Sequence, residues 1–404
     1  MSNNKPFRIS GTGCALVDYL YKPVNFSDHE FARYISKQSG DGGLAPGKLV
    51  FTSEFEKFCG EKYIIIRELV TRKLDPVAIN IGGPSIVSLI HAAQLLTGID
   101  AEVFYYGAGS NDEAGNFILD KLRETPLKVG CYKIVSQNTP FTEVLSDPDY
   151  DNGNGERVFI NNIGAAWQFR PEDLDDAFFK SEIVVFGGTA LVPEIHNNLG
   201  DLLRKAKKHK ALTVVNTVYD FISEKNDPSK PWKLGNSDRT YQFIDLLITD
   251  MEEALRLSGS ENADDSVKFF RDAGVGAMII THGANDLHYF ADNEPFGIVP
   301  LSMLPVSERV RDELRRGKGV FGDTTGCGDN LAGGVLASIA RQMINYQGQP
   351  VNLNLALALG IASGGYACFY HGGTFYEEFP GQKQKIIESY YWDYLRQTGI
   401  IEEA

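Results

Sequence analysis

Short apolar runs alternate with amphipathic stretches along the second half of the chain. The clearest apolar runs cover residues 183–186, 212–215, 246–249 and 277–280. Each run is long enough for a strand but too short for a helix, and helical spacing returns between them, for example at 199–207 and 251–257. Strands that are apolar on both faces are typical of a parallel sheet covered by helices. The pattern predicts an α/β fold, an open and mostly parallel sheet with helices on both faces. Ligands of such sheets bind at the carboxyl ends of the strands, where Asn216 and Asp250 are expected.

The first half of the chain is less regular. Residues 8–20 predict a strand that ends at Asp18, and residues 141–163 predict two strands around a turn rich in Asp, Asn and Gly. Much later in the chain, residues 296–318 are charged, and their apolar residues follow neither helical spacing nor the alternation of a strand. We therefore expect this segment to be irregular.

A long insert, residues 21–76, follows the first predicted strand. Loops of this length are usually functional or mobile. The elements expected in or beside the insert are helices at 28–37 and 53–58 and strands at 48–52 and 77–81. We expect residues 1–404 to form one domain, in which about 21–80 and 141–163 supply a small β lid over the site.

Composition and charge narrow the functional classes. A net charge of −14 argues against nucleic acid as a partner, because a nucleic-acid binder needs a basic face. The five cysteines are scattered and form no C-x-x-C pair, which suits a reducing cytoplasm and offers no zinc site. The start of the chain lacks the apolar core of a secretory signal, and residues 353–369 are interrupted by polar residues and glycines. We therefore expect a cytoplasmic protein with no membrane span.

A glycine-rich turn at residues 322–330, Gly-Asp-Thr-Thr-Gly-Cys-Gly-Asp-Asn, runs directly into a predicted helix. The first turn of a helix has unpaired N–H groups and a partial positive charge, so it binds anions. Gly326 and Gly328 let this backbone approach a ligand closely, and Asp329 could accept a proton from an attacking hydroxyl. The alternative interpretation is that Asp323 or Asp329 only caps the helix.

This turn resembles the D-T-x-G-A-G-D signature of the PfkB (ribokinase-like) carbohydrate kinases, with Cys327 in place of the alanine. The resemblance implies a ribokinase-like kinase that transfers the γ-phosphoryl group of ATP to an alcohol of a sugar or sugar-like small metabolite. It implies Asp329 as the base and the backbone of Gly326, Cys327 and Gly328 as the anion hole. It also places Thr324 at the nucleotide. Asp323 and Thr325 match ligands of a monovalent cation such as K⁺ in some relatives.

The same resemblance assigns Asp18, Gly82, Gly83 and Arg157 to the acceptor. The double glycine belongs to a G-G-x-x-x-N pattern in which this chain has Val87 instead of asparagine. Each of these residues also has a simpler explanation. Asp18 could be a solvated carboxylate at a strand end, Gly82 and Gly83 could form a strand-to-helix turn, and Arg157 could be a solvated charge on a strand.

Nucleotide and metal contacts are implied near the strand ends that follow. Asp250 and Glu253 match N-x-x-E, whose glutamate organises the water shell of Mg²⁺; at i, i+3 they share one helix face. Thr281 and Gly283 match T-x-G-x-x-G, although Asp286 replaces the last glycine, and Gly372 matches a loop that borders the adenine. An acidic helix N-terminus without a metal is the alternative for Asp250 and Glu253.

Two other functions stay open. One is a nucleoside kinase of the same fold, and the other is a non-catalytic binding or regulatory protein that kept the fold, which the departures at Val87, Asp250 and Asp286 favour. An NAD oxidoreductase is disfavoured because no complete G-x-G-x-x-G follows a strand. The aromatic C-terminal stretch, residues 388–397, predicts a helix used for packing or for contact with a second copy of the chain.

Overall fold

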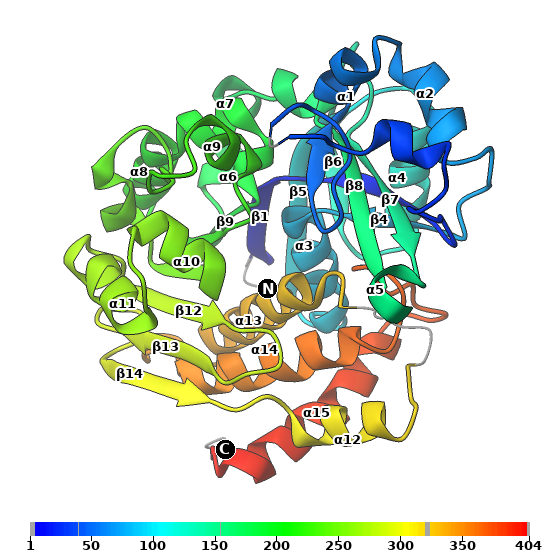
Figure 1. The fold of residues 1–404 in the computed structure, drawn as a ribbon. Helices are drawn as coiled ribbons and strands as arrows, with labels where there is room; N and C mark the ends of the chain where they lie inside the picture. Colours follow the sequence, from blue (N-terminus) through cyan, green and yellow to red (C-terminus); the bar gives the residue numbers. More distant parts are fainter. Residues whose placement is uncertain (1–4, 39, 154, 320–323, 402–404) are drawn as a thin grey trace.

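The protein contains two β-sheets, a large sheet with helices on both faces and a small sheet at one side (Figure 1). The computed structural model describes residues 5–38, 40–153, 155–319 and 324–401. Within these ranges the large sheet has nine strands, in the order β14 (Val299–Leu304), β13 (Leu287–Ala291), β12 (Ala277–Thr281), β11 (Leu246–Asp250), β10 (Leu212–Asn216), β9 (Ile183–Gly187), β1 (Phe7–Gly13), β5 (Ala101–Gly109) and β6 (Lys128–Ile134). All neighbouring strands from β12 to β6 pair in parallel, and β13 and β14 add an antiparallel edge. The predicted α/β sheet is confirmed.

Helices cover this sheet from both sides because successive strand residues point to opposite faces. Val185 and Val214 belong to one apolar core, while Val184 and Val215 belong to the other. The helices on the first side are α3 (Pro84–Leu95), α4 (Glu113–Arg123), α13 (Cys327–Asn345), α14 (Leu353–Ala367) and α15 (Gln382–Thr398). Those on the second side are α6 (Asp176–Phe179), α7 (Pro193–Asn197), α8 (Leu199–Lys208), α10 (Met251–Ser258) and α11 (Ala263–Asp272).

Helix α13 packs closely between α3 and α14, and its small residues make this possible. A Cβ atom on Gly333 would lie 2.5 Å from the backbone oxygen of Ser88 in α3. A Cβ atom on Gly334 would lie 2.5 Å from Oγ of Ser363 in α14. Two helices therefore hold α13 and fix the position of its N-terminus.

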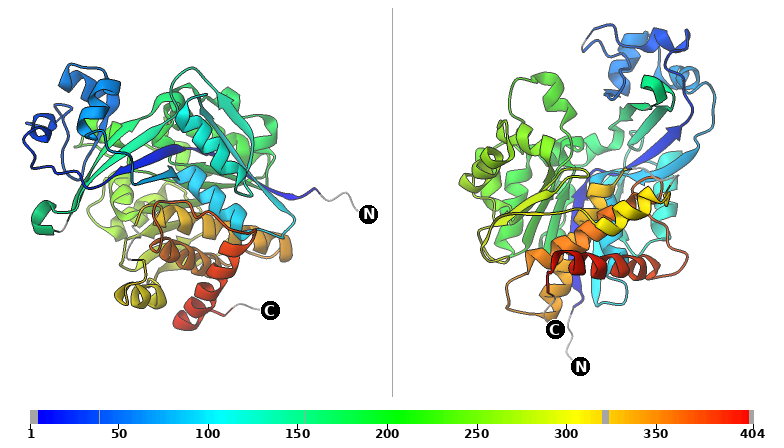
Figure 2. Two further views of the ribbon diagram at one scale, coloured as in Figure 1. Left: turned by 90° about the vertical axis from the view of Figure 1, so that its right-hand side faces the viewer. Right: turned by 60° about the horizontal axis from the view of Figure 1, so that its bottom comes forward.

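The small sheet contains β3 (Leu49–Phe51), β8 (Glu156–Asn162), β7 (Phe141–Asp147), β2 (Leu16–Tyr21) and β4 (Ala78–Gly82), in that order. The predicted pair at 141–163 is confirmed, with β7 and β8 antiparallel. Figure 2 shows the small sheet and the insert projecting from one side of the molecule. Helix α2 (Tyr63–Val70) holds the insert on this sheet, since Arg67 and Tyr63 both bond to the buried carboxylate of Glu143 on β7.

Several sequence predictions were wrong. Residues 8–20 form two strands rather than one, because the chain leaves the large sheet at Gly13, whose φ is 138°, and starts β2 at Leu16. Asp18 therefore lies in the middle of a strand, not at a strand end. Residues 28–37 contain only the 3₁₀ turn η1 (Phe31–Tyr34), and residues 296–318 are not irregular: they form β14 and α12 (Glu308–Arg315).

The other predicted helices are present. Residues 53–58 lie in α1 (Thr52–Cys59), and residues 388–397 lie in α15, whose Tyr390 and Tyr394 are buried while Trp392 is exposed. The remaining short elements are α5 (Tyr150–Gly153), α9 (Phe221–Asn226), η2 (Gly164–Gln168), η3 (Pro171–Asp173), η4 (Thr189–Leu191) and η5 (Asp238–Phe243). No helix in the described ranges combines the length and the apolar composition needed to cross a bilayer.

Candidate active site

The N-terminus of α13 points its first turn toward the junction of the two sheets. Gly326 is the N-cap residue and has a φ of 74°, a left-handed conformation that favours glycine. A side chain here would also collide with Gly373 in the loop after α14. In contrast, a Cβ atom on Gly328 would meet no other group within 4 Å. The backbone is thus crowded at Gly326 by Gly373 but accessible at Gly328. The unpaired N–H groups of this first helical turn can therefore face an anion.

Asp329 lies in this first helical turn, next to Asn216 at the end of β10. Burial raises the pKa of the Asp329 carboxyl group from 3.8 to about 6, and the side-chain amide of Asn216 partly offsets this rise. An amide donor stabilises the charged form of a carboxylate. Asp329 is therefore mostly ionised at neutral pH but holds a proton more readily than an exposed aspartate.

Asp18 approaches the same turn from the small sheet. The thiol of Cys14 is buried, and its pKa is raised first by that burial and then by the charges of Asp18 and Asp329, so both carboxylates lie near this one residue. Asp18 also contacts Gly82 on β4, where any larger residue would collide with its carboxylate. Gly83 follows with a φ of 105° and caps α3.

A cavity of about 580 Å³, here called the acceptor cavity, lies between the small sheet and the loop after α14. Asp18, Arg157, Thr325 and Gly372 all line it. The structure thus brings residues expected at the acceptor, Asp18 and Arg157, together with the end of the turn. Gly372, expected at the nucleotide, lines this cavity as well. Its other lining residues are largely apolar or aromatic, among them Leu16, Phe159, Leu191, Phe221, Phe375 and Tyr376.

A buried polar network supports the turn from behind, and the sequence analysis missed it. Asn330 donates to the backbone oxygens of Gly326 and Gly373, at 2.8 Å in each case. Its side-chain oxygen accepts from Nζ of Lys383 at 2.7 Å and from the hydroxyl of Tyr370 at 3.1 Å. Lys383 is 1% exposed, and burial lowers the pKa of its amine well below the usual range. No local signal marks Lys383, which lies 53 residues from Asn330.

Asp250 and Glu253 form a capping box at the start of α10. The carboxylate of Asp250 accepts from the Glu253 N–H at 2.8 Å, and the Asp250 N–H donates back to Glu253. Glu253 also accepts from the hydroxyl of Thr217, the residue after Asn216. Burial, and next the charge of Asp250, raise the pKa of Glu253 to about 7. The capping role favoured by the simpler interpretation is present. Glu253 is also linked to the neighbourhood of Asp329, because Thr217, which donates to Glu253, directly follows Asn216 in the sequence.

The remaining predicted residues lie at neighbouring strand ends or outside the described ranges. Thr281 ends β12, pairs with Asp250 and donates to the backbone oxygen of Thr249; Gly283 follows in the turn. Thr324 is exposed, and Asp323 lies outside the described residues. In the part of the chain that the structure describes, no group of three or more His, Cys, Asp or Glu side chains could hold a metal ion.

Val87, which replaces the expected asparagine, is buried, and its side chain lies against Gly373. A Cβ atom on Gly373 would be 3.0 Å from a methyl group of Val87. Val87 therefore supports the loop that closes the back of the turn, and an apolar side chain suits that position. Asp286 lies in the turn that joins β12 to β13.

Together the doubly covered parallel sheet, the small second sheet and the glycine-capped helix turn define a ribokinase-like α/β protein. The model of the pfkB family of carbohydrate kinases matches residues 70–378. The chain belongs to this family, and it is a phosphotransferase with an alcohol group as acceptor.

Solved structures agree with this fold at low sequence identity. A probable sugar kinase protein from Rhizobium etli CFN 42 is 18% identical, with a TM-score of 0.66 over 98% of this chain and 100% of that one. The adenosine kinase from Sinorhizobium meliloti is also 18% identical, with a TM-score of 0.66 over 95% of this chain and 99% of that one. The ribokinase from Thermotoga maritima is 15% identical, with a TM-score of 0.59 over 95% of this chain and 99% of that one.

Proposed function

We propose that this protein transfers the γ-phosphoryl group of ATP to an alcohol of a sugar or sugar-like small molecule bound in the acceptor cavity. One observation carries the proposal: a partly buried carboxylate, Asp329, stands in the open first turn of a helix, beside a cavity lined by Asp18 and Thr325. A base and an anion-binding turn in one place are what phosphoryl transfer to an alcohol requires.

Asp329 acts as the base in this proposal. With a pKa of about 6, roughly nine in ten molecules carry the ionised form at pH 7. The carboxylate accepts the proton of the attacking hydroxyl, while the N–H groups of Gly326, Cys327 and Gly328 stabilise the charge that develops on the transferring group. The network of Asn330 and Lys383 keeps this backbone in place, so little reorganisation is needed during the reaction.

The residues around the turn fit a nucleotide and a divalent cation. A Cβ atom on Gly328 would meet nothing within 4 Å, so a ligand can approach the backbone there. The carboxylates of Glu253 and Asp250 supply hard oxygen ligands that suit Mg²⁺ through water. Bound ATP would supply the transferable phosphoryl group, and Mg²⁺ held by these carboxylates would neutralise the charge on its oxygens. Thr281, Gly283 and Thr324 are assigned to the nucleotide. The role of Asp323 and Thr325 at a K⁺ site rests on the family resemblance.

Asp18 and Arg157 orient the acceptor from the small sheet. Asp18 accepts hydrogen bonds from acceptor hydroxyls, and the backbone at Gly82 and Gly83 offers further donors. Arg157 lies on β8 with its guanidinium 5.7 Å from the centre of the Phe159 ring. Closure of the small sheet over the acceptor would exclude water from the reacting groups.

A nucleoside acceptor is the second candidate, and the cavity walls favour it. The aromatic rings of Phe159, Phe221 and Phe375 form apolar surfaces that a simple sugar does not need and that a flat base can fill. Adenosine kinases are among the similar structures.

An ADP-release assay with sugars, nucleosides and polyols, with and without Mg²⁺, tests the function and selects the acceptor class. The Asp329→Asn variant should lose two to four orders of magnitude in turnover while it still binds ATP. Asp264→Asn is the matched control, because Asp264 is an exposed acidic residue in the first turn of α11. Binding of an acceptor without ADP release from the wild type would instead support a non-catalytic protein.

A further inference from the structure

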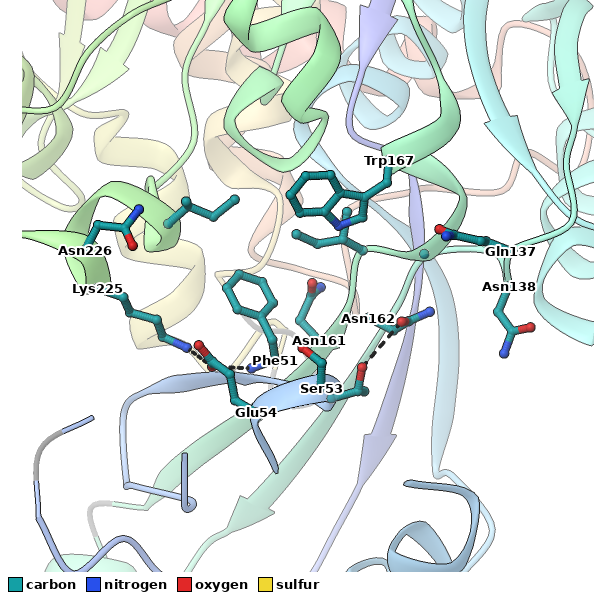
Figure 3. A pocket seen from close by; sticks show the side chains of 14 residues that line it. Phe51, Ser53, Glu54, Gln137, Asn138, Asn161, Asn162, Trp167, Lys225 and Asn226 are labelled. Carbon is teal, nitrogen blue, oxygen red and sulfur yellow. Dashed lines mark hydrogen bonds and ion pairs between the residues drawn. The ribbon is translucent and has the colours of Figure 1, made fainter. Parts of the chain in front are cut away.

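A second cavity of about 570 Å³, here called the amide cavity, lies where the small sheet meets the body of the protein. The insert contributes Phe51 and Glu54 to its wall, η2 contributes Trp167, and α9 contributes Lys225. In Figure 3 the indole of Trp167 is turned toward the space into which Phe51 and Asn161 also point. None of these residues has a role in the function proposed above.

The wall chemistry suits a neutral polar ligand. Five side-chain amides line the cavity: Gln137, Asn138, Asn161, Asn162 and Asn226. Each amide offers both donors and an acceptor, which matches groups of hydroxyls rather than an ion. The charged lining residues Lys225 on α9 and Glu54 on α1 already form an ion pair with each other. Among the described lining residues, charge is therefore balanced and amide groups dominate.

Asn161 provides a second, independent observation. It is 2% exposed, and its Nδ2 donates to Thr142 at 2.9 Å, but its buried side-chain oxygen has no partner within the described ranges. Buried polar atoms are rarely left unpaired in native proteins, and a ligand donor is one way to satisfy them. Asn161 also lines the acceptor cavity, so the two cavities share this wall.

Trp167 adds an apolar surface to these amides. Its side chain is 48% exposed although large apolar side chains are usually covered, and the ring of Phe51 lies in the same wall. Aromatic faces with nearby hydrogen-bonding groups form the usual lining of a small-molecule site. The C–H face of a sugar ring can pack on such a surface while its hydroxyls bond to the amides.

We propose that the amide cavity binds a neutral polyhydroxylated group, a sugar ring or a polyol. This group is either the distal unit of a two-unit phosphoryl acceptor, whose reacting unit lies in the acceptor cavity, or a separate small molecule. The inference rests on the proposed function for the first source only. It also gives the insert a role, because the insert supplies part of the wall.

The test compares the full-length wild type with Trp167→Ala and with the matched control Trp392→Ala, since both indoles are 48% exposed and Trp392 lies on α15. Isothermal titration calorimetry with D-ribose, D-glucose, maltose, sucrose and myo-inositol measures binding. ADP release measures KM and kcat for single-unit and two-unit acceptors. A second variant, Asn226→Leu, narrows the cavity from α9 and replaces Trp167→Ala if that variant does not fold.

For a distal unit, a two-unit acceptor has a KM at least tenfold lower than its single-unit counterpart. Trp167→Ala removes this advantage with kcat within twofold of wild type, and Trp392→Ala keeps it. For a separate molecule, a sugar that is not phosphorylated binds tenfold more weakly to Trp167→Ala only. Equal behaviour of the two tryptophan variants in both assays overturns the inference. If no acceptor releases ADP, the proposed function fails, while calorimetry still decides on the cavity.

A pair of cysteines at the catalytic turn carries an independent inference. Cys327 is the first residue of α13, and Cys368 is the C-cap residue of α14. Their sulfur atoms are 3.4 Å apart, and neither is in a disulfide. The helices hold the two residues together, since a Cβ atom on Gly364 would lie 2.7 Å from the backbone oxygen of Cys327.

We infer that a peroxide oxidises this pair to a disulfide and thereby reduces kinase activity. One thiolate attacks the peroxide O–O bond and becomes a sulfenic acid as one water forms. The second thiol then displaces the sulfenic oxygen, which leaves as a second water, and the S–S bond closes. Two thiols are oxidised and one peroxide is reduced. The new bond would restrain the residue whose N–H group belongs to the anion hole.

Hydrogen peroxide treatment of wild type and Cys368→Ser tests this inference, with Cys59→Ser as the control outside the pair. Wild type and Cys59→Ser should lose at least fivefold in activity, recover with dithiothreitol, and yield a Cys327–Cys368 peptide in non-reducing mass spectrometry. Cys368→Ser should start with normal activity and resist reversible loss. Equal reversible inactivation of Cys368→Ser, or no linked peptide from inactivated wild type, would refute the switch.

Discussion

Replacing Asp329 by asparagine should remove catalysis and stabilise the fold at the same time. Burial raises the pKa of Asp329 from 3.8 to about 6, so the folded protein favours the protonated form more than the unfolded chain does. At pH 7 the group is charged in both states, and the folded state bears a cost of at most about 3 kcal/mol. Part of the residue still reaches solvent, so we expect asparagine to recover about 1–2 kcal/mol of unfolding free energy.

The pH dependence gives the sign of this effect. Below about pH 3.8 the carboxyl group is protonated in both states, and the advantage of asparagine disappears. As the pH rises from 3.8 through about 6, the wild type loses stability relative to the variant, and above that range the difference is constant. The kcat/KM of the wild type should fall below about pH 6 for the same reason, because the base becomes protonated.

Urea unfolding of wild type, Asp329→Asn and the control Asp264→Asn at pH 7 and pH 4 measures the difference. The control should change stability by less than about 0.5 kcal/mol at both values. A variant that is less stable than wild type at pH 7, or a stability difference that does not depend on pH, would show that Asp329 is not a buried charge. Full activity of Asp329→Asn would remove it from the mechanism.

Three further predictions concern the support of the turn and the metal. Lys383→Met should lower the free energy of unfolding by about 1–3 kcal/mol and should change kcat more than KM. The exposed control Lys385→Met should leave stability and kcat unchanged. A normal kcat in Lys383→Met would mean that Lys383 serves folding alone. Gly326→Ala should lower kcat at least tenfold, because the new side chain would collide with Gly373. Gly348 has a similar φ of 81° but no neighbour within 4 Å, so Gly348→Ala should leave activity unchanged. Equal effects of the two substitutions would contradict the collision. Glu253→Gln should raise the Mg²⁺ concentration needed for half-maximal activity about tenfold, and an unchanged Mg²⁺ titration would exclude this role.

The sequence predicted the large sheet because its strands are apolar on both faces and helices of regular spacing separate them. It also predicted the turn before α13, where the glycines and Asp329 are contiguous. Local patterns failed at Asp18, since Cys14 and Ala15 are as apolar as the strands on either side and hide the passage from one sheet to the other. Helix α2 was missed because Tyr63–Val70 contains three consecutive isoleucines, a run that resembles a strand.

The support of the site could not be predicted from local sequence. Lys383, Tyr370 and Asn330 meet only when α13, α15 and the loop after α14 are assembled. The same holds for Asn216: its place at a strand end was expected, but its contact with Asp329 depends on how α13 packs against the sheet. A buried polar group reveals its purpose only through its partners, and these partners are distant in sequence.

The two aspartates of the site come from different layers of the protein, and this arrangement bears on the hydrolysis of ATP in the absence of an acceptor. Asp18 belongs to the small sheet and Asp329 to the helix layer of the large one, and both charges act on Cys14. Like charges repel, so under the proposed function we expect any movement of the small sheet toward α13 to cost more electrostatic energy without an acceptor than with one. A hydroxyl placed between the carboxylates relieves that repulsion, and water, which brings no ring to fill the aromatic walls, does so poorly. Under the proposed function, we therefore expect repulsion between the two aspartates to discourage ATP hydrolysis until an acceptor binds.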